Sequence, residues 1–189
     1  MKHIVTGQVL LIMCCMVYTI WWYRGFRPEK HVSRVVGING VLLMVTVVLG
    51  IAGIIFSLIP ENRNLADRSV QIPQKMNTMH IIFAGIVGYL ILLLVTQYFL
   101  KREVTTELIL IVGWITLEVA VINRLNAEGF LPDNRFFGMC IVLAIAFVIS
   151  IILYVMYYRM DDTKAFYSAM IPLITEAVSM GVLLIAIIV

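Results

Sequence analysis

Six long blocks of apolar residues, separated by short polar segments, make up most of the chain. The blocks cover about residues 4–23, 35–59, 79–100, 106–123, 136–158 and 165–188. A helix of about 20 apolar residues matches the hydrocarbon layer of a bilayer, which is about 30 Å thick. Strands of a membrane barrel would alternate apolar and polar residues over about ten positions, and these blocks do not alternate. The pattern predicts an all-α, polytopic membrane protein with six transmembrane helices in a compact bundle.

The composition supports this class and adds no second domain. Hydrophobic residues make up 62% of the 189 positions and charged residues 13%, against about 45–50% and about 25% in soluble domains. No linker or low-complexity tract interrupts the blocks, so we expect residues 1–189 to form a single six-helix transmembrane domain. The first block is too long for the core of a signal peptide and lacks a small-residue cleavage site, which predicts a retained span.

The distribution of lysine and arginine predicts the orientation of the chain. Four basic residues directly follow the first block, and one precedes it. Over the whole chain, the first, third and fifth loops carry eight basic residues, and the N-terminus with the other two loops carries six. Basic loops tend to stay in the cytoplasm. We therefore predict a multi-pass protein of the cell membrane, with both termini outside and segments 24–34, 101–105 and 159–164 in the cytoplasm.

Two glutamates stand alone inside apolar blocks, Glu118 in GWITLEVAVI and Glu176 in IPLITEAVSM. A charge at the centre of a bilayer costs at least about 2.5–3.5 kcal/mol, so such residues are rarely kept without a function. Glu118 lies eleven residues beyond Glu107 and Glu176 eleven beyond Ala165, near the cytoplasmic starts of their blocks, which is about 16 Å along a helix. Thr46 lies twelve residues into the second block, which runs in the same direction. The two carboxyl groups and this hydroxyl are therefore predicted to share one layer near mid-membrane.

The chemistry of such a layer favours the binding of a proton or a cation. If the glutamates approach within a few ångströms, burial and like-charge repulsion both disfavour ionising them together. A shared proton or a bound cation resolves this conflict, as in coupled transport and in conductive pathways. We therefore predict a proton, ion or substrate site formed by Glu118, Glu176 and Thr46.

Three further residues are predicted to support this site. Pro172, four residues before Glu176, cannot donate to the Ser168 carbonyl and can kink its helix, as in the broken helices of transporters. Trp114 lies one turn before Glu118 on the same helical face, although ordinary packing explains this tryptophan equally well. Asn39 lies near the start of the second block, where it is expected to bind across helices or to line an inner vestibule.

Small residues in the blocks predict close contacts between helices rather than binding. The pairs spaced three apart are Gly37/Gly40, Gly50/Gly53 and Gly85/Gly88. Ala177 and Gly181 show the small-xxx-small spacing found where helices touch in membranes.

The sequence lacks the motifs of common enzyme and cofactor sites. No GxSxG, HExxH or Walker loop occurs, no lysine stands in mid-span for a retinal Schiff base, and three histidines cannot supply four haem ligands. Cys14, Cys15 and Cys140 lie within apolar blocks without metal-ligand spacing, and we interpret them as small hydrophobic residues. We expect no metal, no cofactor, no disulfide framework and, in the absence of a basic cluster interleaved with aromatics, no nucleic-acid partner.

These patterns favour a transporter or channel-like protein whose mid-membrane acidic site is coupled to protons or cations. Its expected partners are the lipid bilayer and a small ion or small-molecule substrate. One alternative is a non-catalytic accessory subunit of a larger membrane complex or homo-oligomer, with each glutamate protonated and serving as a hydrogen-bonded strut. A less favoured alternative is an intramembrane lipid-modifying enzyme that uses the paired carboxylates as general acid and base.

Overall fold

All described elements of the chain are helical. The computed structural model describes residues 2–26, 37–59, 78–101, 106–157 and 159–188, and no strand occurs among them. Six helical stretches are long and apolar enough to cross a membrane: Lys2–Gly25, Ile38–Leu58, Thr78–Phe99, Glu107–Ala127, Asp133–Tyr157 and Thr163–Ile187. The all-helical prediction is confirmed, and the six apolar helices are consistent with a multi-pass membrane protein.

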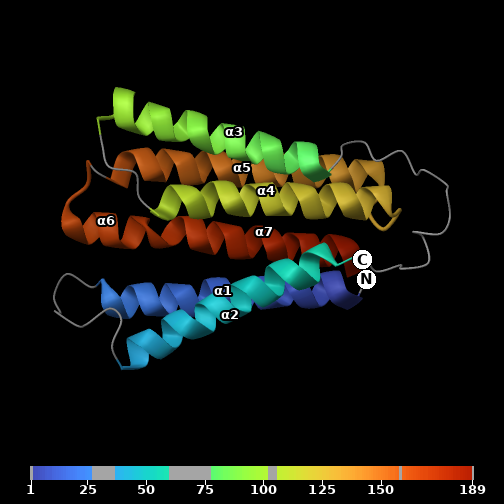
Figure 1. The fold of residues 1–189 in the computed structure, drawn as a ribbon, viewed down its shortest axis with the longest axis horizontal. Helices are drawn as coiled ribbons and strands as arrows, with labels where there is room; N and C mark the ends of the chain where they lie inside the picture. The colour runs from blue at the N-terminus through green and yellow to red at the C-terminus, as the bar shows by residue number, and fades with distance from the viewer. Residues whose placement is uncertain (1, 27–36, 60–77, 102–105, 158, 189) are drawn as a thin grey trace. The chain divides into compact units, whose positions relative to one another are not determined.

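The helices belong to two compact units, Met1–Ser69 with Val155–Val189 and Val70–Tyr154. The first unit holds α1 (Lys2–Gly25), α2 (Ile38–Leu58), α6 (Asp162–Ser168) and α7 (Met170–Ile188). The second unit holds α3 (Thr78–Leu94), the π-helical turn η2 (Val95–Phe99), α4 (Thr106–Ala127) and most of α5 (Asp133–Tyr157) (Figure 1). We expected residues 1–189 to form one transmembrane domain. That the two units together form this single domain stays a prediction.

The fourth helix runs past its predicted end at residue 123. The polarity of the segment suggested a loop there, but Arg124 lies in the last turn of α4 and donates from Nε to Glu128 Oε1 at 2.8 Å. An ion pair four residues apart is compatible with a continuing helix. The helix ends at Ala127, and the turn after it contains Gly129, whose φ of 80° is the left-handed conformation that glycine adopts just beyond helix ends. The side-chain amide of Asn126 then donates to Asp133 Oδ1 at 3.0 Å and joins the turn to α5.

In the first unit, α1 packs against α2 and against α7. The contact with α2 brings the two backbones together at Gly7. A Cβ atom on Gly7 would lie 2.5 Å from the Ser57 backbone nitrogen and 2.9 Å from the Gly53 carbonyl oxygen, and a Cβ on Gly53 would lie 2.7 Å from the Leu11 side chain. The predicted close approach is therefore confirmed for Gly53. Gly7, which the spacing did not single out, is the tighter position.

In the second unit, α3 packs against α4, and Gly85 marks the contact. A Cβ atom on Gly85 would lie 2.7 Å from Thr116 Cγ2, whereas a Cβ on Gly88, one turn further along the same helix, would meet nothing within 4 Å. Gly181 of α7 is equally open. The glycine spacing thus identified positions that can approach a neighbouring helix, but only some of them do.

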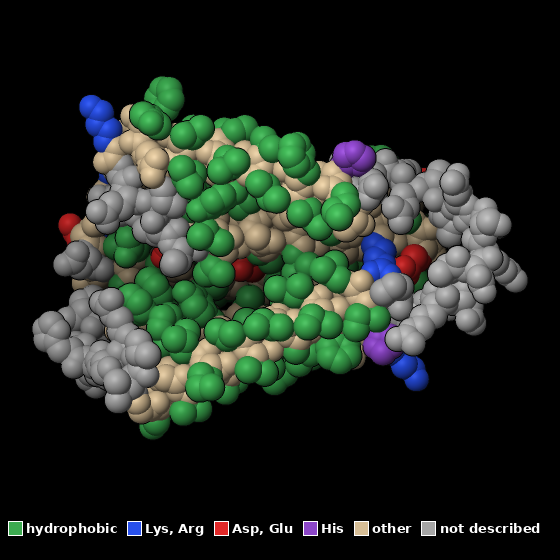
Figure 2. All heavy atoms as spheres, viewed as in Figure 1, with side chains coloured by type: hydrophobic (Ala, Val, Ile, Leu, Met, Phe, Trp, Pro, Cys, Tyr) green, Lys and Arg blue, Asp and Glu red, His purple; other side chains and the backbone are tan. Residues whose placement is uncertain are grey.

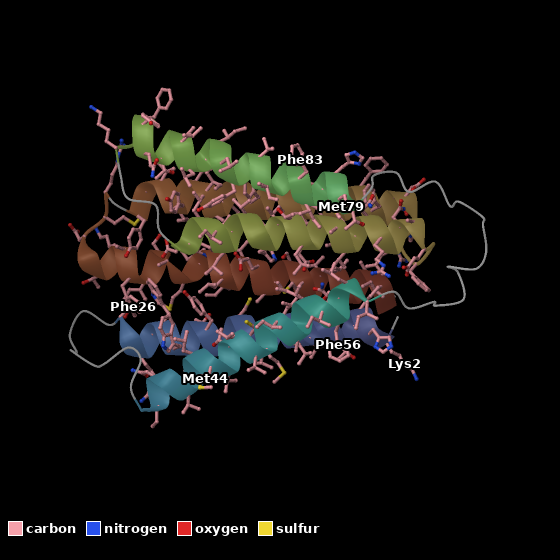
Figure 3. The ribbon with its side chains drawn as sticks, viewed as in Figure 1. Lys2, Phe26, Met44, Phe56, Met79 and Phe83 are labelled. Atoms are coloured by element: carbon pink, nitrogen blue, oxygen red, sulfur yellow. The ribbon has the colours of Figure 1, made fainter. Side chains whose placement is uncertain are left out.

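The outward faces of α2 and α3 are covered by apolar side chains, as Figure 2 shows along both helices. Met79 and Phe83 project from α3 (Figure 3) and are 72% and 67% exposed, and Met44 of α2 is 71% exposed. Within α3 only Ile81 is buried. Lipid chains cover such surfaces in a membrane, whereas a soluble protein rarely exposes contiguous apolar patches of this kind.

Candidate functional site

Glu176 lies on the buried stripe of α7 and is only 5% exposed. Leu173 precedes it by about one turn and Met180 follows it by one turn, and both are buried. This spacing places the carboxyl group on the same helical face as these apolar side chains. The hydroxyl of Ser179, which is also buried, donates to the Glu176 carbonyl oxygen at 2.7 Å. The acid therefore lies on the buried face of α7.

Cys14 of α1 lies at the same level as Glu176. The rings of Tyr23 in α1 and Phe166 in α6 are 5.9 Å apart between centroids. The first turn of α1 and the last turn of α7 lie at the same end of this unit (Figure 1), so α1 and α7 run in opposite directions. From that ring contact Cys14 is nine residues away and Glu176 ten, a difference of about 1.5 Å in axial position. The Glu176 carboxyl group interacts electrostatically with the Cys14 thiol.

Thr46 of α2 contacts the same cysteine through its backbone. The Cys14 thiol donates to the Thr46 carbonyl oxygen at 3.2 Å and joins α1 to α2. The Thr46 side chain is buried, and its hydroxyl donates to the Leu42 carbonyl oxygen at 2.9 Å within its own helix. Cys14, Thr46 and Glu176 thus lie at one level, where α2 and α7 both pack on α1. We call this arrangement the Cys14 junction.

Glu118 belongs to the second unit, in the middle of α4, and is 0% exposed. Trp114, one turn earlier, is buried as well, and its indole N–H has no hydrogen-bond acceptor among the described residues. An unsatisfied buried donor of this kind costs about 1–3 kcal/mol, so this face of α4 combines an acid with unused hydrogen-bonding capacity. That Glu118 shares one site with Glu176 and Thr46 stays a prediction.

Asn39 and Pro172, the two remaining predicted residues, both belong to the first unit. Asn39 is buried at the start of α2, and its Oδ1 accepts a hydrogen bond from Arg24 Nε at 3.4 Å, so the contact across helices is the role observed. The sixth apolar stretch divides into α6 and α7 at Ala169, three residues before Pro172, because a proline at 172 cannot donate to the Ser168 carbonyl. That carbonyl is eight residues from Glu176, about 12 Å along the helix axis.

Sequence reasoning missed several polar residues that the structure buries. Gln8 of α1, Ser57 of α2 and Ser150 of α5 are fully buried, and Cys14 was interpreted as a small hydrophobic residue. Single amides, hydroxyls and thiols in apolar blocks are common, so composition gave no reason to choose them. The usable signal is periodicity, because Gln8 and Cys14 both lie three residues from the buried Leu11 on one face of α1.

Within the described part of the chain, no group of three or more histidine, cysteine, aspartate or glutamate side chains could hold a metal ion. Cys14, Cys15 and Cys140 are thiols and form no disulfide. No protein-family model, curated protein or solved structure matches the chain.

Proposed function

We propose that this protein is an integral membrane protein of the cell membrane that moves protons or small cations across the bilayer. Glu118 and Glu176 would carry the charge in transit, and Thr46 would contribute neutral oxygen atoms. The observation that supports this most strongly is the burial of both glutamates. Of eleven acidic residues in the chain, these two alone lie in the middle of apolar blocks, and both are at most 5% exposed.

The physical reasoning begins with the cost of a buried carboxylate. An ionised carboxyl group inside hydrocarbon is expensive unless a proton or a cation neutralises it. This cost favours a glutamate that has bound a proton or a cation over the empty carboxylate. Such a glutamate can take up the ion from one side of the membrane and release it to the other, down the gradient of that ion. Neutral oxygens beside a carboxylate, such as the Thr46 hydroxyl, retain acceptor lone pairs. They can therefore share the solvation of a cation that has lost its water.

An accessory subunit is the second candidate, and the exposed face of α3 favours it. A helix with a single buried residue among its seventeen could dock on a partner helix in a larger complex. Lipid covers such a face equally well, so this surface alone does not distinguish the two functions. An accessory subunit does not need a conductive path, and a flux measurement therefore separates the candidates.

The experiment is reconstitution of the purified protein into liposomes that enclose a pH-sensitive dye. An imposed pH gradient, or a gradient of sodium or potassium, should produce proton or cation flux well above that of protein-free vesicles prepared in parallel. Correct insertion is checked by protection of the six apolar helices from protease. Flux at the protein-free level under every gradient would contradict transport and would favour the accessory subunit.

A further inference from the structure

Cys14 itself has no role in the proposed transport function, although it lies at the centre of the Cys14 junction. The Cys14 thiol is half-buried, donates to the Thr46 carbonyl oxygen on the neighbouring helix and interacts with the Glu176 carboxyl group. The backbone of α2 also makes room for it, because a Cβ atom on Gly50 would lie 3.4 Å from Cys14 Sγ. The sulfur atom is therefore held between one helix that it binds and another that carries the acid.

The neighbouring cysteine provides a comparison for this placement. Cys15 differs from Cys14 in direction by about 100° around the helix axis. Its carbonyl oxygen accepts from the Thr19 hydroxyl at 2.7 Å within α1. Both thiols are half-buried, but Cys14 is the one whose thiol donates to the backbone of α2. A residue that served only as a small hydrophobic side chain would not require the thiol donor that bridges α1 and α2.

We propose that Cys14 is a positioning residue of the Glu176 site, where its thiol fixes α2 to α1 and sets the environment of the carboxyl group. This inference rests on the proposed transport function and names a residue that regulates that same site. The thiol is a weak donor, so its hydrogen bond orients the sulfur without locking the helices. A change of charge or of donor at this position should therefore alter the pH at which Glu176 takes up its proton.

Few other titratable groups in the first unit lie near this level. Those on α1 besides Cys14 are Lys2, His3, Cys15, Tyr18, Tyr23 and Arg24, and α2 carries none. On α7 Glu176 is the sole titratable residue, and those on the described part of α6 are Asp162, Lys164 and Tyr167. Among these, Tyr18 lies one turn from Cys14, and Cys15 is its direct neighbour, about 100° away around the helix axis. The remaining groups are at least nine residues from the level of the junction along their helices.

The test compares aspartate with its neutral isostere at two adjacent positions. Cys14→Asp and Cys14→Asn, with Cys15→Asp and Cys15→Asn as matched controls, are reconstituted and their flux is measured against pH. A second carboxylate placed close to Glu176 disfavours the ionisation of Glu176, because like charges repel each other. The midpoint of the flux profile should therefore move to higher pH by about one unit or more between Cys14→Asn and Cys14→Asp, and clearly less for the Cys15 pair. Equal shifts at the two positions, or no shift at Cys14, would overturn the inference.

A second pair of variants covers the case in which aspartate at position 14 prevents folding. Cys14→Ser keeps a donor to the Thr46 carbonyl oxygen and should preserve the wild-type pH profile, whereas Cys14→Ala removes the donor and should shift it. Identical profiles for serine and alanine would contradict a positioning role. Glu176→Gln measured in the same vesicles separates the two proposals. If Glu176→Gln retains flux, the proposed function fails; if it abolishes flux while the Cys14 variants leave the profile unchanged, this inference alone fails.

Discussion

Replacing Glu118 or Glu176 with glutamine should reduce proton or cation flux to the level of protein-free vesicles while the protein stays folded. Glutamine keeps the shape and most of the hydrogen-bonding capacity of a protonated glutamate, but it cannot ionise or bind a cation by charge. The free energy of unfolding should change by less than about 1 kcal/mol, because interhelical polar contacts in membranes are weak. Flux in proteoliposomes and unfolding in mixed micelles are measured on the same preparations.

A matched control replaces an acid outside the apolar blocks. Asp161 has a side chain that is 85% exposed beside Lys164, so Asp161→Asn removes the same charge where water already solvates it. This variant should retain wild-type flux. Unchanged flux in both glutamine variants would contradict a transport role for the two acids and would favour hydrogen-bonded struts instead.

Adding a side chain at Gly7 should cause the largest loss of stability in the first unit. In Gly7→Ala the new methyl group would meet backbone atoms of Ser57 and Gly53, which cannot move aside as a flexible side chain can. Overpacking of this kind typically costs about 1–3 kcal/mol, and Gly7→Leu should cost more because its side chain is larger. The free energy of unfolding is measured by circular dichroism as sodium dodecyl sulfate is added to detergent micelles.

The control for this substitution is Gly181→Ala in α7, where the added Cβ meets nothing within 4 Å. Alanine is favoured over glycine in a helix by about 1 kcal/mol, so this variant should be as stable as the wild type or more so. Equal stability losses at Gly7 and Gly181 would show that the α1–α2 contact at Gly7 is not as close as described.

The helices were predictable because their length and apolarity follow from the thickness of a bilayer, which leaves a strong mark on the sequence. The end of the fourth helix was not, because the polarity of Arg124 and of its ion-pair partner Glu128 suggests a loop, whereas α4 continues to Ala127. Glycine spacing also could not show which glycine of a pair makes the contact with a neighbouring helix. Gly85 and Gly88 look alike in the sequence, and only the position of α4 decides that Gly85 is the contact.

The burial of the two glutamates was predictable from the sequence, but the contact made by Cys14 was not. An isolated glutamate in an apolar block is expected to be buried, because lipid cannot solvate its charge, and both glutamates are buried. Cys14 was missed because a thiol among apolar residues resembles a hydrophobic side chain. Its partner is the backbone carbonyl of Thr46, and a carbonyl oxygen is present at every residue, so no pattern of side chains points to it.

Infrared titration of the two glutamates tests most directly whether they form one site. The carboxyl C=O band of a protonated glutamate is followed against pH in the wild type, in Glu118→Gln and in Glu176→Gln, so that each single variant reports the acid that remains. Groups that share a site titrate as a coupled pair when they interact by more than about one pH unit. A shared proton or cation site therefore predicts that removing either acid moves the titration of the other by more than about one pH unit. Titrations that are unchanged in both variants would contradict a shared site.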